Sequence, residues 1–162
     1  MLKEIQNYAY QHPLDFNFTK LCDLLAQESY DLAEIQIKTL IKQVDFAALP
    51  FAKNSYSRSV IINNQNYWLG LLNWDKGATT RIHGHPQQAF VYVISGGLRC
   101  KNFSKTPLVE LGKSKLEQGQ YRYNKGIEGK MDNYIHQISA GAPSVSLHFY
   151  SDDPIKGEVF DL

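Results

Sequence analysis

The spacing of apolar residues divides the chain into two parts. Up to about residue 45, apolar residues recur three or four positions apart, which predicts amphipathic helices. Pro13 interrupts the first such segment, and Ser29 and Asp31 stand just before the third, where helix caps are favoured. The apolar positions of the three segments are Leu2, Ile5 and Ala9; Leu21, Leu24 and Leu25; and Leu32, Ala33, Ile35, Leu40 and Ile41. We expect these helices to cover one side of a sheet.

From Ser55 onward, short runs of β-branched and aromatic residues alternate with turn sequences. The runs that predict strands cover residues 56–62, 67–73, 88–95, 98–103, 115–117, 120–123, 135–139 and 144–151. Short strands at this spacing are typical of a β-sandwich or β-barrel, not of a parallel sheet with crossover helices. We expect one mainly β domain over residues 1–162, with a helical part at 1–45 and a β-barrel at 55–152.

Charge and composition exclude several classes of partner. The chain has 17 basic and 16 acidic residues and no basic run, so neither nucleic acid nor an anionic membrane is expected as its main partner. The sequence from Met1 to Gln6 contains no apolar signal region, and no stretch approaches the length needed to span a membrane. Cys22 and Cys100 are far apart, which indicates neither a disulfide framework nor a cysteine-type zinc site. We expect a soluble cytoplasmic protein.

A histidine pair lies in the segment Thr80–Pro86, between two predicted strands. In an extended chain His83 and His85 project to the same face, and two imidazoles on one face suit a metal ion. His136, in the apolar frame of residues 134–138, is a candidate third ligand. The alternatives are a solvated or hydrogen-bonded histidine pair and a satisfied core histidine at position 136. Three histidines would suit zinc or copper as well as iron.

The last predicted strand has one apolar and one polar face. Val145, Leu147 and Phe149 alternate along it with Ser146, His148 and Tyr150. Inside a barrel the polar set must satisfy its own hydrogen bonds, and a Ser–His–Tyr chain is able to do so. Such a chain would control the phenolic proton of Tyr150. The alternative is a half-exposed strand whose polar face lies in water.

An arginine interrupts the face of another predicted strand. Arg58 shares a face with Tyr56, Val60 and Ile62. If this face is interior, the guanidinium needs an anion, and a bound carboxylate offers a bidentate fit. Alternatively, Arg58 reaches solvent along its aliphatic stem. Arg81 competes for the same role, because it shares a face with the histidine pair.

Together these segments resemble the cupin superfamily and, within it, the cysteine dioxygenase family of thiol dioxygenases. The resemblance spans about residues 46–152 and is carried by Tyr56-Ser57-Arg58, Trp74, Ile82-His83-Gly84-His85, Gly96-Gly97-Leu98, Ile135-His136 and Val145-Ser146-Leu147-His148-Phe149-Tyr150-Ser151. Histidine pairs of this kind occur across all cupins, whereas the ordered set of these motifs is more specific. The resemblance implies a jelly-roll β-barrel with the N-terminal helices packed on its outside.

The resemblance also implies a reaction and a role for each candidate residue. It implies an iron(II)-dependent enzyme that oxidises L-cysteine with O2 to cysteine sulfinic acid. The implied iron ligands are His83, His85 and His136; Arg58 would bind the substrate carboxylate and Tyr56 would line its pocket; Ser146, His148 and Tyr150 would form a hydrogen-bond chain whose Tyr150 hydroxyl faces the thiol and O2.

The chain departs from the cupin pattern at two points. Gln87 and Gln88 stand where cupins usually have a glutamate after the histidine pair, an absence typical of thiol dioxygenases. Some family members have a cysteine that is crosslinked to the tyrosine equivalent to Tyr150; here the position is Gln88 or Ala89, so no thioether is expected. Within the resemblance, an arginine at position 58 favours cysteine over 3-mercaptopropionate, whose enzymes tend to have glutamine. The alternatives are another metal-dependent cupin enzyme, for a different thiol carboxylate, for carbon–carbon cleavage or for isomerisation, and a non-enzymatic cupin that binds a small ligand.

Overall fold

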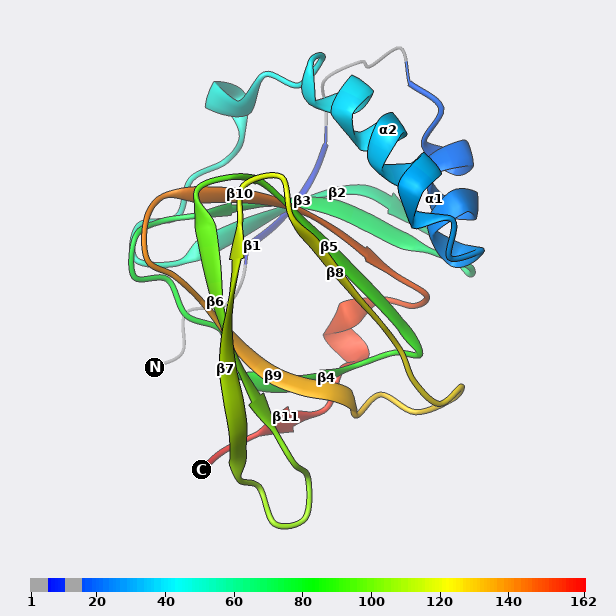
Figure 1. Ribbon diagram of the computed structural model, residues 1–162. Helices are drawn as coiled ribbons and strands as arrows, with labels where there is room; N and C mark the ends of the chain where they lie inside the picture. Colours follow the sequence, from blue (N-terminus) through cyan, green and yellow to red (C-terminus); the bar gives the residue numbers. More distant parts are fainter. Residues whose placement is uncertain (1–5, 11–15) are drawn as a thin grey trace.

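A computed structural model describes residues 6–10 and 16–162 (Figure 1). In this part of the chain, two helices lie on one side of a β-sandwich, and both were predicted from the sequence. They are α1 (Phe18–Ala26) and α2 (Tyr30–Ile41), followed by the short 3-10 helix η1 (Phe46–Ala48). The side chain of Asn17 caps α1 by accepting the Lys20 backbone N–H at 3.0 Å. Ser29 is the N-cap residue of α2, and Asp31 lies in its first turn, where a negative charge is favourable.

The helix predicted around Ala9 is wrong for the residues that the structure describes. Gln6–Ala9 instead form strand β1, which pairs in parallel with residues 57–60 of the neighbouring strand. A helix interrupted at Pro13 would be too short to be stable, whereas the edge of a sheet offers unpaired amides to an extended segment. Leu2, Ile5, His12 and Pro13 lie outside the described residues.

The strands form two sheets. In spatial order, the first sheet contains β1, β2 (Tyr56–Asn63), β3 (Trp68–Trp74), β10 (Ser144–Tyr150), β5 (Gln88–Ser95) and β8 (Tyr121–Lys125). The second contains β11 (Val159–Phe160), β4 (Ile82–His85), β9 (Asn133–Ala140), β6 (Gly97–Phe103) and β7 (Glu110–Glu117). The two sheets face each other as a jelly-roll sandwich and are not hydrogen-bonded into one closed barrel (Figure 1). The predicted fold class, mainly β with helices outside, is confirmed.

The helices cover the outer face of the first sheet, as expected. Leu21, Leu25 and Ile37 are fully buried and belong to one core cluster with Leu147 and Phe149 of β10. Burial of each such side chain contributes roughly 1.5–3 kcal/mol. The apolar face of β10 therefore points to the helices, which leaves its polar face inside the sandwich.

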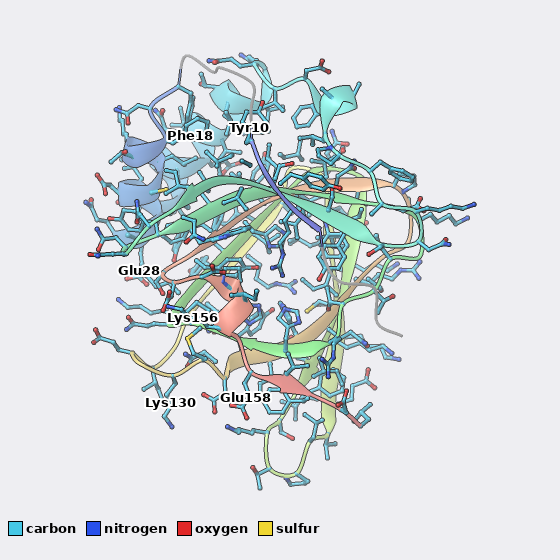
Figure 2. The ribbon with its side chains drawn as sticks, turned by 180° about the vertical axis from the view of Figure 1, so that it is seen from behind. Tyr10, Phe18, Glu28, Lys130, Lys156 and Glu158 are labelled. Atoms are coloured by element: carbon cyan, nitrogen blue, oxygen red, sulfur yellow. The ribbon has the colours of Figure 1, made fainter. Side chains whose placement is uncertain are left out.

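The predicted strands differ from the observed ones mainly at their ends. β5 has the predicted bounds, whereas β7 begins at Glu110 rather than at Lys115. The added residues are mostly exposed and carry no alternating apolar pattern, and only their pairing with β6 makes them extended. β11 was not predicted; it follows the 3-10 helix η2 (Pro154–Lys156) and pairs with β4. In Figure 2, Lys156 and Glu158 mark this C-terminal segment, on the side away from Phe18 of α1.

Within residues 6–10 and 16–162, no helix combines the length and the apolar character needed to cross a membrane.

Candidate metal centre

The three candidate histidine ligands come from adjacent strands of the second sheet. His83 and His85 lie on β4, and His136 lies directly opposite His83 on β9. One ring nitrogen from each of the three lies within 4.8 Å of the others, and the ring centroids are 4.3–4.8 Å apart. The period of two in β4 places the histidine pair on one face, and the β4–β9 pairing adds the third ring. The three side chains could hold one metal ion.

Gly84 allows other parts of the chain to approach the histidine strand closely. A Cβ at this position would lie 2.5 Å from Cα of Asp132, so any side chain would push away the segment that leads into β9. On the other side, the Gly84 backbone N–H donates to the Glu158 carbonyl at 2.8 Å, and Val159 pairs with His83. β4 is thus held between β9 and the C-terminal segment.

Hydrogen bonds fix which nitrogen of each ring is free. Nδ1 of His83 lies 2.8 Å from the Arg81 carbonyl, and Nδ1 of His85 lies 2.9 Å from the Tyr134 carbonyl. Because a carbonyl only accepts, both Nδ1 atoms are protonated, and in the neutral rings each Nε2 has a free lone pair. This is the tautomer that a metal ligand requires.

His136 gives the sharpest test of whether a metal fits. Its Nδ1 lies 3.5 Å from Sγ of Cys100, and its buried Nε2 has no hydrogen-bond partner in the described part of the chain. An unsatisfied buried polar atom costs roughly 1–3 kcal/mol. A metal ion held jointly with His83 and His85 would satisfy it, so the donor set fits such an ion.

Burial keeps the three rings neutral. Desolvation lowers the pKa of His83 to about 4 and places the pKa values of His85 and His136 well below the usual 6.5. The neighbouring imidazoles lower the pKa values of His85 and His136 further, because a second positive charge nearby is unfavourable. At neutral pH all three are therefore unprotonated donors.

A hydrogen-bond chain runs along the polar face of β10. Nε1–H of Trp74 donates to Oγ of Ser146 at 2.9 Å, Ser146 Oγ lies 2.7 Å from Nε2 of His148, and Nδ1 of His148 lies 2.9 Å from the Tyr150 hydroxyl. Among the described residues, Nε2 of His148 is the only acceptor that the Ser146 hydroxyl reaches, so the hydrogen of Ser146 is satisfied only in the tautomer in which Nε2 accepts it. His148 then carries its proton on Nδ1 and donates it to the Tyr150 oxygen. The Tyr150 hydroxyl is left to donate to a further group.

Tyr150 lies beside the histidine cluster as a neutral phenol. Its ring centroid is 5.7 Å from that of His85. Burial raises the pKa of Tyr150 far above 10, and burial also lowers the pKa of His148 to about 3, with a smaller contribution from the Arg58 charge. The chain of neutral groups therefore keeps a hydrogen-bond donor next to the three histidines.

Arg58 lies at the border of the site, and Arg81 does not. Cζ of Arg58 is 6.0 Å from the ring centroid of Tyr56, and the half-buried guanidinium makes no ion pair with a carboxylate of the described residues. Its positive charge contributes to the low pKa values of His83 and His148. Arg81 instead pairs with Asp161 at 3.2 Å on the surface.

Sequence reasoning missed two residues that shape the site. Asn133 fixes the loop between β8 and β9: its Nδ2 donates to the carbonyls of His85, Ile127 and Lys130 at 3.1–3.3 Å. Arg122 of β8 lines a small interior cavity of about 20 Å³ together with His85, His136, His148 and Tyr150. The loop-like composition of 125–134 was the only available signal for Asn133; Arg122 gave none.

The volume of this cavity and the burial of the residues around it indicate from which side a ligand reaches the histidines. About 20 Å³ is room for roughly one water-sized group. His85 and His136 are buried, whereas His83 and Arg58 are only partly buried. A larger ligand therefore reaches the histidines from the side of His83 and Arg58.

Comparison with solved structures identifies the fold. A conserved protein of Klebsiella pneumoniae subsp. pneumoniae with a double-stranded β-helix domain matches with a TM-score of 0.55 at 15% identity, covering 72% of this chain and 93% of its own. A cupin superfamily protein of Desulfitobacterium hafniense matches with a TM-score of 0.54 at 12% identity, covering 68% and 91%. These similarities show the fold alone. No curated protein matches the chain.

A sequence model of the family described as cysteine dioxygenase type I matches residues 16–160. The match covers both helices, the strands from β2 to β11 and all the candidate site residues described above. It extends well beyond residues 46–152, to which the sequence motifs pointed. The chain belongs to the cysteine dioxygenase type I family.

Proposed function

We propose that the protein is an iron(II)-dependent thiol dioxygenase that oxidises L-cysteine with O2 to cysteine sulfinic acid. The observation that carries the proposal is the combination of the three histidines, with Nε2 of His136 unsatisfied, and the Tyr150 hydroxyl beside them. Family membership supports the reaction class, since the chain matches the cysteine dioxygenase type I model. Both atoms of O2 would end on the sulfur, which takes a thiol to a sulfinic acid.

The ligands proposed for the iron are His83, His85 and His136. When bound there, iron(II) would supply the oxygen chemistry and favour the thiolate over the thiol, because three neutral ligands leave its positive charge uncompensated. The carbonyls that hold the Nδ1–H groups of His83 and His85 orient those rings toward a shared ion.

The proposed role of Arg58 is to bind the carboxylate of cysteine, with Tyr56 lining the same pocket. A half-buried guanidinium without a carboxylate partner in the described residues, whose charge is felt by His83, is suited to a bidentate anion. Fixing the carboxylate would orient the sulfur toward the histidines, and such positioning accounts for a large part of many rate enhancements.

The proposed role of Ser146 and His148 is to hold the Tyr150 hydroxyl in place. Because His148 donates to the Tyr150 oxygen, the phenolic hydrogen points to a different acceptor. A thiolate sulfur or the developing sulfinate oxygens beside the histidines would be that acceptor. Since thiols remain reduced in the cytosol, we also place the reaction there.

Oxygen uptake by the iron(II)-loaded protein with L-cysteine tests the proposal, with sulfinate measured in the same sample. Coupled uptake and sulfinate formation are expected, and the zinc-loaded protein is the matched control, expected to give neither. Cysteamine, which lacks the carboxylate, is expected to be a much poorer substrate. Bound iron without uptake would contradict the thiol dioxygenase assignment and favour another cupin chemistry or a non-enzymatic ligand-binding role.

A further inference from the structure

The outer face of the second sheet carries a hollow that the histidine site does not use. Its volume is about 610 Å³, and β6, β7 and β9 contribute most of its lining. Along β9, His136 and Ile138 point into the sandwich, so the alternating residues Gln137 and Ser139 point outward, into this hollow. The sheet lies between the hollow and the histidines, and Cys100 of β6 touches both: it lines the hollow, and its Sγ lies 3.5 Å from Nδ1 of His136.

Four basic side chains line the hollow and face one another in pairs. Arg99 lies directly opposite Lys115, and Lys101 directly opposite Lys113, in the β6–β7 ladder. Like charges directly opposite each other destabilise a sheet. Two such pairs side by side concentrate positive charge at a cost to the fold, and an anion bound between them would remove this cost.

The rest of the lining suits an anion as well. In the β6–β9 ladder, Arg99 pairs with Ser139 and Lys101 with Gln137, so each row of cations continues into a neutral polar side chain. None of the carboxylates in the described part of the chain lines the hollow. The nearest ion pair, from Lys113 to Glu110, is long at 3.9 Å.

The position of Arg99 depends on a glycine. A Cβ at Gly141 would lie 3.2 Å from Cζ and Nη2 of Arg99, so the guanidinium passes over this glycine. The turn between β9 and β10 thus leaves room for the Arg99 side chain beside the hollow.

We propose that this hollow, lined by Arg99, Lys101, Lys113 and Lys115, binds a small molecule that carries two or more phosphate groups. Its volume lies in the range of about 300–1,000 Å³ that is typical of small-molecule sites. The Cβ atoms of residues directly opposite each other lie about 5 Å apart, and those of successive residues on one face of a strand about 7 Å apart, so the four cations stem from an area that suits linked phosphates better than a single anion. The proposal is independent of the thiol chemistry on the inner face.

The flanking charges favour a small ligand over a nucleic acid strand. Glu110 and Glu117 stand at the two ends of β7, so the positive area is bounded by a carboxylate on each side. A long polyanion that followed the strand would run onto these carboxylates. The nearly balanced charge of the whole chain, +1, provides no extended basic surface to compensate.

Isothermal titration calorimetry of the metal-free protein with inorganic tripolyphosphate at low salt tests the proposal. We expect one-to-one binding that weakens as salt is added. The double variants Lys101→Gln/Lys113→Gln and Arg99→Gln/Lys115→Gln are each expected to bind at least about tenfold more weakly. The control Lys20→Gln/Lys42→Gln removes the same charge from exposed positions on the helical side and should leave binding unchanged.

Four results would overturn the proposal. The first is the absence of tripolyphosphate binding to the unmodified protein. The second is a loss of affinity in the control Lys20→Gln/Lys42→Gln equal to that in the double variants of the hollow, because the effect would then depend only on net charge. The third is binding of inorganic sulfate as tight as that of tripolyphosphate, which would leave only a general anion contact. A short single-stranded DNA that bound at least about tenfold more tightly than tripolyphosphate would replace the small molecule with a nucleic acid. Because no metal or thiol is present, none of these results depends on the proposed dioxygenase activity.

Discussion

Ala89 of β5 lies directly opposite Tyr150 of β10, and both face the interior beside the histidines. Its neighbour Gln88 points the other way, where its Nε2 donates to the Ala26 carbonyl at 3.0 Å. Of the two positions that the sequence left open for the crosslinking cysteine of some relatives, position 89 is therefore the one beside the tyrosine. With a methyl group there, the Tyr150 ring has no thiol to react with.

This register predicts that Ala89→Cys gains a crosslink. During turnover with iron(II), cysteine and O2, we expect a thioether between Cys Sγ at position 89 and the Tyr150 ring, because residues directly opposite have Cβ atoms about 5 Å apart. Mass spectrometry of the intact protein would show the loss of two hydrogen atoms. The double variant Ala89→Cys/Tyr150→Phe is the control, and a loss of the same mass in that variant would place the crosslink elsewhere.

His136→Ala is expected to lower the iron retained after desalting at least about tenfold, because one of three ligands and its orphaned Nε2 are removed. Metal analysis per protein chain measures it. The matched variant His148→Gln changes a histidine that bonds Ser146 and Tyr150, and it should retain iron. Equal iron in His136→Ala and the unmodified protein would remove His136 from the ligand set.

Arg58→Gln is expected to lower kcat/KM for L-cysteine by about 30- to 1,000-fold, equivalent to roughly 2–4 kcal/mol for a charge-assisted bidentate contact. Activity with cysteamine should change little, since that substrate has no carboxylate. Arg81→Gln should leave both values unchanged, because Arg81 pairs with Asp161 on the surface. The carboxylate role would be rejected if both substrates lost activity equally.

Ser146→Ala should destabilise the protein by roughly 2–3 kcal/mol. It leaves the buried Trp74 N–H and His148 Nε2 without their shared partner. Urea unfolding at neutral pH measures the loss. Ser144→Ala is the control. Ser144 is a buried serine on the same strand, and its hydroxyl forms hydrogen bonds with Gly97 and Ala142, outside the hydrogen-bond chain of Trp74, Ser146, His148 and Tyr150. Ser144→Ala should change the near-ultraviolet tryptophan signal, to which Trp68 and Trp74 both contribute, less than Ser146→Ala does, and an unchanged signal in Ser146→Ala would contradict the assignment.

The metal-free protein is expected to lose stability as the pH falls below about 6.5. Burial lowers the pKa of His83 to about 4 and of His148 to about 3, and lowers those of His85 and His136 as well. The unfolded chain titrates near 6.5 and so binds more protons in this interval, which makes the free energy of unfolding fall as pH falls. Each histidine contributes about 1.4 kcal/mol per pH unit.

Urea unfolding at about pH 7 and about pH 5.5 measures this dependence. His148→Gln removes one of the four histidines whose pKa values are lowered in the folded protein, so its slope with pH should be smaller by about a quarter. A stability that stays constant over this interval would show that the folded histidines take up protons as readily as the unfolded chain.

Local patterns were sufficient wherever short-range geometry decides the structure. The period of two placed His83 with His85 and separated Ser146, His148 and Tyr150 from the apolar side of β10, because alternation is a property of any extended strand. Helical spacing located α1 and α2, because residues three or four apart share a face of any α-helix. The prediction of a helix failed at residues 6–9, because these residues form a strand only by pairing with β2.

Which side chains share a face follows from the alternation along each strand, whereas what each face contacts follows from the packing of distant segments. The polar face of β10 is interior because the helices cover its apolar face. His136 completes the cluster because β9 pairs with β4 about 50 residues earlier, and the pairing of β6 with β7 in the same sheet brings Arg99 opposite Lys115. Arg58 rather than Arg81 borders the histidines because Arg81 meets Asp161 of the C-terminal segment. These outcomes depend on the free energy of many contacts between distant segments, which no single stretch of sequence contains.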